Sequence, residues 1–202
     1  CKLFNMGADE YANDKFTSGS MGFGNLQSTG KYSYYVAYVN HVATMIKDAG
    51  MKPMAFNDGI YFNNNTSSGT FDTDIIVCYW SNGWDGYTPM PAATLDNMGF
   101  SLINTHGSYY WVLGKSDWQC DASKASGFSY KEFQGSTIDK PAGSMFCVWA
   151  DYPGAETEAS VIRKTSATIA AFGKTLPAVS AVIPEPGITI TPSDGTASGS
   201  TK

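Results

Sequence analysis

The run Ile75–Trp80 limits the possible folds of this 202-residue chain more than any other stretch. Its residues, Ile-Ile-Val-Cys-Tyr-Trp, are apolar or aromatic throughout and rich in β-formers. A strand with one solvent face alternates polar and apolar residues, whereas a parallel strand with helices on both sides is apolar at successive positions. We therefore expect a buried strand of a parallel sheet, and with it an α/β fold.

Segments of strand and helix character alternate on both sides of this run. Further strands are predicted at residues 2–7, 54–57, 101–105 and 143–149, and helices at residues 33–49, 92–98 and 156–174. Residues 16–30 are rich in Gly and Ser and show no period, which predicts a long loop. Repeated βα units imply a parallel sheet.

Apolar residues at helical spacing predict the faces of the two longer helices that cover the sheet. They are Tyr35, Val39, Val42, Met45, Ile46 and Ala49 in the first helix, and Ala159, Ile162, Ile169 and Phe172 in the last. Gly50 is a stop signal for the first helix. We interpret His41 in that helix as a surface residue and not as a ligand.

Asp9 and Glu10 stand directly behind the first predicted strand, a buried one that ends at Gly7. In a parallel α/β sheet, ligands bind beyond the carboxyl ends of the strands, where side chains point into a crevice. Gly7 leaves room for a close approach, and neighbouring side chains diverge, so the two acids could take two roles. The local sequence fits an exposed acidic pair that caps the next helix equally well.

Composition argues against several classes of partner. A net charge of -5 without a block of Lys or Arg disfavours nucleic acid and an anionic membrane surface. No apolar run approaches the roughly 20 residues that span a bilayer. The 12 Tyr, 11 Phe and 5 Trp suit a carbohydrate cleft, in which sugar rings stack on aromatic side chains, although most of these residues are expected to fill the core.

The four cysteines form no Cys-x-x-Cys pair and have no His at metal spacing, so we expect no metal site. They are Cys1, Cys78, Cys120 and Cys147. We expect free thiols, of which only Cys120 is exposed. Residues 177–202 are dominated by Pro, Ser, Thr and Gly, which predicts a linker leading out of the folded domain.

Asn5–Glu10 resembles the His/Asn-x-Gly-x-Asp-Glu signature of family 20 glycoside hydrolases, the β-N-acetylhexosaminidases. Further stretches match in the same order: Asp9–Asp14, Ala55–Gly59, Tyr79–Trp84 and Trp149–Asp151. The set is most similar to the branch of surface-attached Gram-positive enzymes. Four separated motifs in register over residues 1–176 argue against a chance resemblance.

The resemblance implies a parallel (β/α)8 TIM barrel, in which the family carries its Asp-Glu pair at the end of the fourth strand. Five strands cannot close such a barrel, which takes eight strands and about 250 residues. We therefore expect residues 1–176 to be strands 4–8 with their helices, the C-terminal part of the catalytic barrel. Its partner is the missing N-terminal half, which includes the family's substrate-binding arginine from the first strand.

The implied chemistry is substrate-assisted, because family 20 enzymes use the 2-acetamido group of the substrate as the nucleophile. Carried over by position, Glu10 is the general acid and then the general base, and Asp9 holds and polarises the acetamido N–H. Tyr109 is implied as the donor to the acetamido oxygen, which orients the internal nucleophile. The outcome is retention, without a cofactor.

The resemblance also implies residues that bind the sugar. Trp80 and Trp149 would wall the pocket, and Asp151 would bond the O4 or O6 hydroxyl. Weaker matches are Trp84, Asn57 and Asp58.

Two positions depart from the family pattern. Phe56 stands where many members have tryptophan, and Trp111 stands where they have an acid two residues past the matching tyrosine. Both positions concern sugar recognition more than the reaction. The choice between GlcNAc, GalNAc and larger units therefore stays open.

The function that the resemblance implies is a retaining exo-β-N-acetylhexosaminidase that removes terminal β-linked GlcNAc from extracellular glycans. One alternative is a lacto-N-biosidase of the same family, which releases a disaccharide. A second is a carbohydrate-binding module, which predicts a β-sandwich with alternating apolar residues. A third is an inactive fragment of the same ancestry, since a half-barrel has open sheet edges and lacks the arginine.

Overall fold

The central element of the fold is a five-stranded parallel sheet with the strand order β1-β2-β3-β4-β8. Its strands are β1 (Leu3–Asn5), β2 (Lys52–Phe56), β3 (Ile76–Tyr79), β4 (Leu102–Asn104) and β8 (Gly143–Ser144). The computed structural model describes residues 2–11, 22–84, 87–152 and 154–178. The predicted parallel α/β architecture is confirmed.

Two smaller strand pairs complete the described part of the chain. They are the parallel pair β5 (Trp111–Val112) and β9 (Val148–Trp149), and the antiparallel hairpin of β6 (Glu132–Phe133) and β7 (Ser136–Thr137). The segment predicted as one strand at 143–149 is thus divided into β8 and β9. It pairs first with β4 and then with β5.

Helices follow the strands along the chain. They are α1 (Gly22–Ser28), α2 (Tyr32–Asp48), α3 (Ala92–Asn97), α4 (Ala122–Ala125) and α5 (Glu158–Thr175), with short 3-10 turns at Phe62–Asn64, Gly107–Tyr109 and Ser116–Trp118. The helix α1 corrects the prediction of a loop over residues 16–30, of which 16–21 lie outside the described residues. Burial of Phe23 at its start anchors this segment to the core despite the weak helix formers around it.

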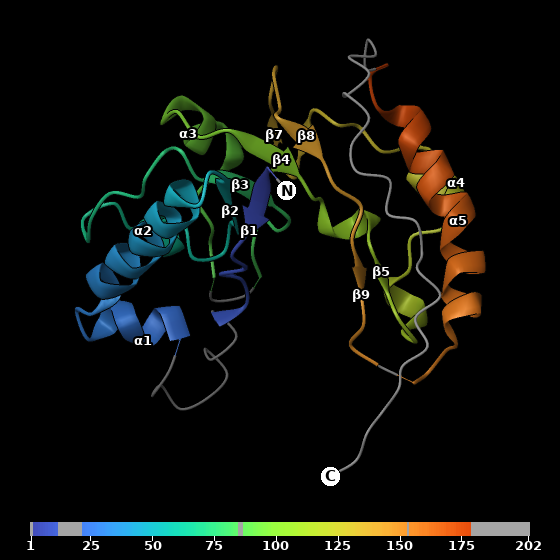
Figure 1. Cartoon of the computed structure of the whole chain (residues 1–202), viewed down its shortest axis with the longest axis horizontal. Coiled ribbons are helices and arrows are strands. Elements are labelled where there is room, and N and C mark those ends of the chain that lie inside the picture. Colours follow the sequence, from blue (N-terminus) through green and yellow to red (C-terminus); the bar gives the residue numbers. More distant parts are fainter. Residues whose placement is uncertain (1, 12–21, 85–86, 153, 179–202) are drawn as a thin grey trace.

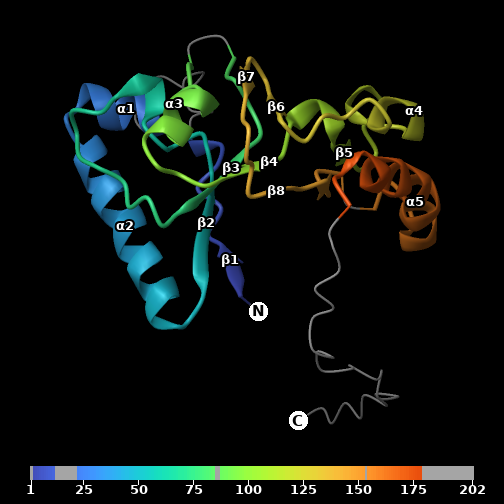
Figure 2. The same ribbon diagram turned by 90° about the horizontal axis from the view of Figure 1, so that it is seen from above.

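The helices form two groups (Figures 1 and 2). The helices α1, α2 and α3 lie beside β1, β2 and β3, whereas α4 and α5 lie together on the far side of β5 and β9. The strands β4 and β8 connect the two groups. The sheet is therefore a parallel half-barrel, with β1 at one border.

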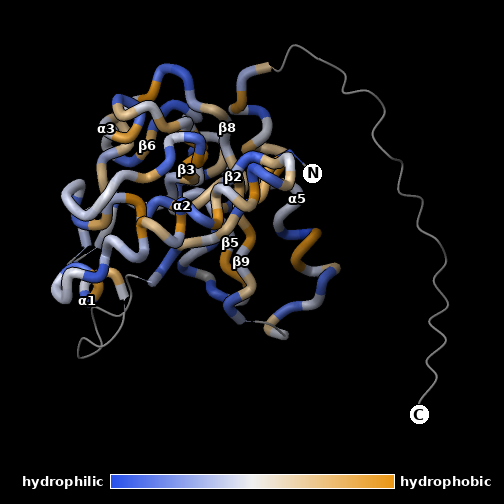
Figure 3. Tube along the Cα trace, turned by 60° about the vertical axis from the view of Figure 1, so that its left-hand side comes forward, coloured by the Kyte–Doolittle hydropathy of each residue, from blue (hydrophilic) through white to orange (hydrophobic). Residues whose placement is uncertain are grey.

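Side chains alternate between two cores along the central strands. Ala55 and Val77 point to the main core under α2 and α3, whereas Met54, Phe56 and Cys78 form a second cluster on the opposite face. Successive residues of a strand point to opposite sides, and both sides of β2 and β3 are covered. Hydrophobic residues recur along β3, β5 and β9, as the colouring of Figure 3 shows. The continuous apolar run at Ile75–Trp80 follows from this double burial.

Several predicted burials are wrong. Leu3 and Phe4 are exposed, because β1 forms the border of the described sheet. In α2, Met45 is exposed, and Ala49 is exposed just beyond the end of the helix. In α5, Ile162 and Ile169 are exposed because Thr165, Thr168 and Phe172 make the buried face.

The cysteine prediction holds in part. Cys78, Cys120 and Cys147 are free thiols, whereas Cys1 lies outside the described residues. Cys120, predicted as exposed, is buried in a cluster with Ala125, Phe128 and Phe172, in which α4 packs on α5. A cysteine packed in this way behaves as a small apolar side chain.

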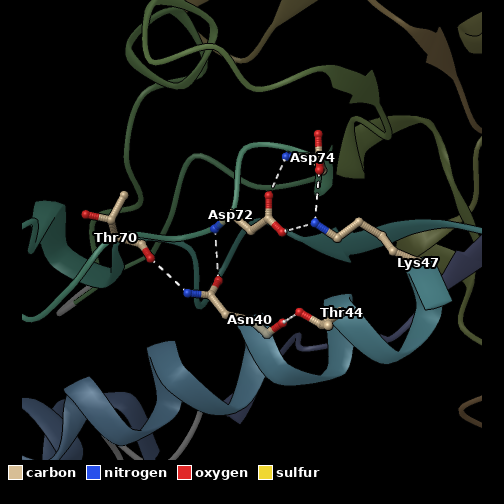
Figure 4. Close-up of polar contacts among 6 residues, drawn as sticks. All are labelled: Asn40, Thr44, Lys47, Thr70, Asp72 and Asp74. Carbon is tan, nitrogen blue, oxygen red and sulfur yellow. Dashed lines mark hydrogen bonds and ion pairs between the residues drawn. The ribbon is translucent and has the colours of Figure 1, made fainter.

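A polar clamp fixes α2 to the segment before β3 (Figure 4). Lys47 binds Asp72 at 2.5 Å and Asp74 at 2.9 Å. Asn40 accepts the backbone N–H of Asp72 and donates to the carbonyl of Thr70, each at 2.9 Å. The clamp lies on the outer face of the fold, and His41 is exposed in the same helix, as predicted.

Candidate active site

An open pocket of about 480 Å³ lies at the carboxyl ends of the strands. Its lining combines three carboxylates with five aromatic side chains and one valine: Asp9, Glu10, Phe56, Trp80, Tyr110, Val112, Trp118, Trp149 and Asp151. Five residues that the sequence predicts, Asp9, Glu10, Trp80, Trp149 and Asp151, come together here.

The acidic pair stands on a tightly turned backbone after β1. Gly7, Ala8 and Glu10 all have left-handed φ angles, at 76°, 69° and 56°. Such angles cost a non-glycine residue of order 1–3 kcal/mol and persist where the surroundings hold them. Here Phe56 donates its backbone N–H to the carbonyl of Gly7 at 2.9 Å. The turn leaves Asp9 half-buried and Glu10 exposed at the pocket.

Asp58 stands directly behind this turn and is fully buried. One of its carboxylate oxygens accepts the backbone N–H of Glu10 at 2.7 Å, and the other accepts the indole N–H of Trp80. Burial raises the pKa of Asp58 to about 7, a rise that these two hydrogen bonds oppose and the charge of Asp9 reinforces. Asp58 therefore does not line the pocket, but it holds two residues that do.

Trp80 is fixed by its backbone as well as by its indole. Its N–H donates to Oδ1 of Asn57 at 2.9 Å, and its carbonyl accepts from Gly107 at 2.8 Å and from Gln134 at 2.7 Å. Asn57 is buried, and its amide donates to the carbonyl of Ser81 at 2.8 Å. Asn57, a predicted sugar ligand, is thus an internal brace for the end of β3.

The structure brings Tyr110, and not the predicted Tyr109, to the pocket. Tyr109 turns toward α4, where its ring packs on Phe128 at 5.1 Å. Burial raises the pKa of Tyr110, and the charges of Glu10 and Asp151 raise it further. The cause is a turn between β4 and β5. Seven positions separate Asn104 from Trp111, but only four separate their partners Ser144 and Val148, so three extra residues shift which tyrosine faces inward.

Aromatic rings form the remaining walls. Phe56 packs on Trp149 with ring centroids 5.8 Å apart. Trp118 is about half exposed, and Nζ of Lys115 lies 3.5 Å from its ring centroid. The sequence analysis did not predict Trp118 or Val112, because a two-residue strand and a single 3-10 turn are too short to show a periodic pattern.

Trp84 also lies outside the pocket lining. Its ring packs on Tyr87 at 4.4 Å and on Trp80 at 5.9 Å, so it supports the wall from behind. Within the described ranges, His, Cys, Asp and Glu residues form no group of three that could hold a metal ion. In the same ranges no helix has the length and apolarity needed to cross a membrane. What the pocket offers chemically is acid/base groups between aromatic faces, a combination that suits a sugar ring.

Known structures share this fold. No family model matches the chain. A structure of the tandem GH20 catalytic modules of the pneumococcal exo-β-D-N-acetylglucosaminidase StrH is 32% identical with a TM-score of 0.75, and the match covers 86% of this chain and 43% of that one. A second StrH structure, from work on N-glycan recognition and hydrolysis, is 31% identical with the same TM-score. This chain spans less than half of the StrH chains that it matches.

More distant structures agree in fold alone. Dispersin B is 16% identical with a TM-score of 0.64, and the match covers 86% of this chain and 53% of that chain. A β-N-acetylhexosaminidase from Bacteroides fragilis is 12% identical with a TM-score of 0.57, covering 87% of this chain and 35% of that one. The predicted match to part of a family 20 TIM barrel is confirmed, and the alternative of a β-sandwich is wrong.

Proposed function

Because this chain is related to the family 20 glycoside hydrolases and matches part of their catalytic barrel, we propose that it carries the acid/base part of a β-N-acetylhexosaminidase active site. The observation that carries the proposal is the convergence of Asp9, Glu10, Trp80, Trp149 and Asp151 on one pocket. The preferred substrate is a terminal β-linked GlcNAc of a glycan outside the cell. GalNAc is the second candidate substrate.

The reaction starts when the acetamido oxygen of the substrate attacks the anomeric carbon from within the same sugar. Asp9 accepts the acetamido N–H and balances the positive charge that develops on the ring formed in this step. Glu10 gives its proton to the departing glycosidic oxygen. Glu10 then takes a proton from water, and the water oxygen attacks the anomeric carbon. This attack breaks the bond to the acetamido oxygen, which opens the cyclic intermediate and restores the acetamido group with retention of configuration.

We assign the hydrogen bond to the acetamido oxygen to Tyr110 instead of Tyr109. Tyr110 lines the same pocket as Asp9 and Glu10, whereas Tyr109 packs on Phe128 away from it. An internal nucleophile reacts fast only when it is held close to the anomeric carbon, and a single hydroxyl donor can hold it. Trp80 and Trp149 stack on the sugar, and Asp151 accepts a sugar hydroxyl.

A hydrolysis assay tests this proposal. It uses the full-length protein, by which we mean a protein that contains this chain together with the expected N-terminal half of the barrel. We expect release of the aryl group from aryl β-GlcNAc, and release of free GlcNAc from a GlcNAc-terminated oligosaccharide. A disaccharide product without monosaccharide would identify a lacto-N-biosidase instead. Binding of GlcNAc without turnover of any of these substrates would identify an inactive remnant that retains carbohydrate binding.

A further inference from the structure

Asp58 does not line the pocket, but it binds two residues that do. It follows β2, it is buried, and both of its carboxylate oxygens are engaged. Because Asp58 is fully buried and does not line the pocket, its carboxylate is not open to a sugar hydroxyl. The two donors, the backbone N–H of Glu10 and the indole N–H of Trp80, come from the ends of β1 and β3. Asp58 therefore ties three neighbouring strand ends together.

The tie to Glu10 matters because the backbone there is strained. Glu10 has a φ of 56° and Ala8 a φ of 69°, which L-residues rarely adopt without support. The hydrogen bond to Asp58, at 2.7 Å, is charge-assisted and anchors the residue at its backbone N–H. The Glu10 side chain itself is exposed, so its direction depends on how firmly its backbone is held.

Building on the proposed function, we propose that Asp58 is the positioning residue that sets the general acid Glu10 and the pocket wall Trp80 in one fixed geometry. It touches neither the substrate nor the reacting atoms. It acts by accepting two N–H donors with one carboxylate. Only an ionised carboxyl offers two equivalent acceptors, since a protonated carboxyl turns one oxygen into a donor.

The positioning is therefore expected to depend on pH. Burial raises the pKa of Asp58 to about 7, and the charge of Asp9 after β1 raises it further. Tyr35 on α2 and Tyr87 after β3 also face this carboxylate, whose charge raises the pKa of both tyrosines. Below this pH the carboxyl takes up a proton and one of the two N–H groups loses its acceptor. Above it both bonds form. Protection of the N–H group that loses its acceptor, the Glu10 amide or the Trp80 indole, should thus rise between about pH 6 and pH 8.

The test is the substitution Asp58→Asn in the full-length protein. Asparagine keeps the shape of the aspartate side chain, but its single amide oxygen accepts only one of the two N–H groups. Its NH₂ group then faces the other N–H, which it cannot accept. We expect a fall in kcat of roughly 10- to 100-fold on an alkyl β-GlcNAc, which needs protonation by Glu10, and a smaller fall on an aryl glycoside with a good leaving group. Asp72→Asn, which removes a charge from the clamp at α2, is the matched control and should keep wild-type kinetics.

A second readout does not need activity. Hydrogen exchange at the Glu10 amide and at the Trp80 indole N–H, corrected for its intrinsic pH dependence, should show at one of them a protection step near pH 7. Asp58→Asn should abolish this step and Asp72→Asn should keep it. The absence of a step at both N–H groups, or equal losses of kcat on both substrates, would overturn the inference. If the wild-type protein hydrolyses no β-GlcNAc, the proposed function fails while the exchange measurement still decides the role of Asp58. Should Asp58→Asn not fold, the wild-type protection step alone decides, and its absence counts against the inference.

Discussion

Asp9 and Glu10 are adjacent in the chain and line one pocket, yet their proposed tasks differ. If Glu10 is the acid, Glu10→Gln should lose roughly 10²- to 10⁴-fold in kcat on substrates with poor leaving groups, and much less on an activated aryl glycoside. If Asp9 supports the acetamido group, Asp9→Asn should harm turnover of both substrates, because both pass through the same cyclic intermediate. Steady-state kinetics on the two leaving groups measures this pattern.

The reverse pattern would exchange the two roles. In that case a good leaving group would rescue Asp9→Asn but not Glu10→Gln. Added azide offers an independent check on Glu10, because an external anion needs no general base. It should attack the cyclic intermediate from the face where water normally enters, so azide should rescue Glu10→Gln and give a β-glycosyl azide.

The two neighbouring tyrosines provide a matched pair at the same scale. Tyr110→Phe removes the hydroxyl that we assign to the acetamido oxygen, and kcat should fall roughly 10- to 100-fold, the loss typical of a hydrogen bond to a charged group. The hydroxyl of Tyr109 is 3.5 Å from the carbonyl of Gly127, a long contact. Tyr109→Phe should therefore stay within about two-fold of wild type. Equal kinetics for both variants would refute the assignment.

At the scale of elements, Gly59 shows why β2 can end so close to α2. A β-carbon at Gly59 would lie 2.2 Å from the hydroxyl of Tyr35 and 2.6 Å from Phe23. We expect Gly59→Ala to lower the free energy of unfolding by about 1–3 kcal/mol, because rings in a packed core must move. Urea unfolding of the full-length protein, followed by circular dichroism, gives the value.

The control for this substitution is another glycine in the same region. Gly24 lies exposed in α1, and a β-carbon there would meet nothing within 4 Å. Gly24→Ala should stabilise the protein by about 0.5–1 kcal/mol, since alanine loses less backbone entropy in a helix. If Gly59→Ala and Gly24→Ala changed the free energy of unfolding alike, crowding would not explain why glycine stands at position 59.

The same elements explain which parts of the fold the sequence could predict. The runs at β2, β3 and β4 were located because double burial leaves a continuous apolar pattern that local sequence reports directly. The exposure of Ile162 and Ile169 was missed, because which stripe of α5 is buried depends on the orientation of α4, not on the apolar period itself. Tyr109 was named from the family resemblance, and local sequence does not report which of two adjacent tyrosines the turn Gly107–Tyr109 directs to the pocket.

At the scale of the whole molecule, the described sheet is a half-barrel that leaves apolar side chains exposed toward its borders. Leu3 and Phe4 on β1 and Val148 on β9 are each more than 40% exposed. Apolar surface of this kind is normally covered in a closed barrel, whose strands have no free edges. The fold therefore presents one part of a pocket wall, and it matches 43% of the StrH chain.

We accordingly expect residues 1–202 alone to bind or hydrolyse β-GlcNAc poorly, and the full-length protein to be active. The physical reason is that acid/base groups accelerate hydrolysis only on a sugar that the rest of the pocket holds in place. Aryl β-GlcNAc hydrolysis by both proteins at equal molar concentration measures the difference, and light scattering reports whether the isolated chain associates through its exposed borders. An isolated, monomeric chain with the kcat/KM of the full-length protein would contradict this expectation, because the half-barrel would then contain the complete site.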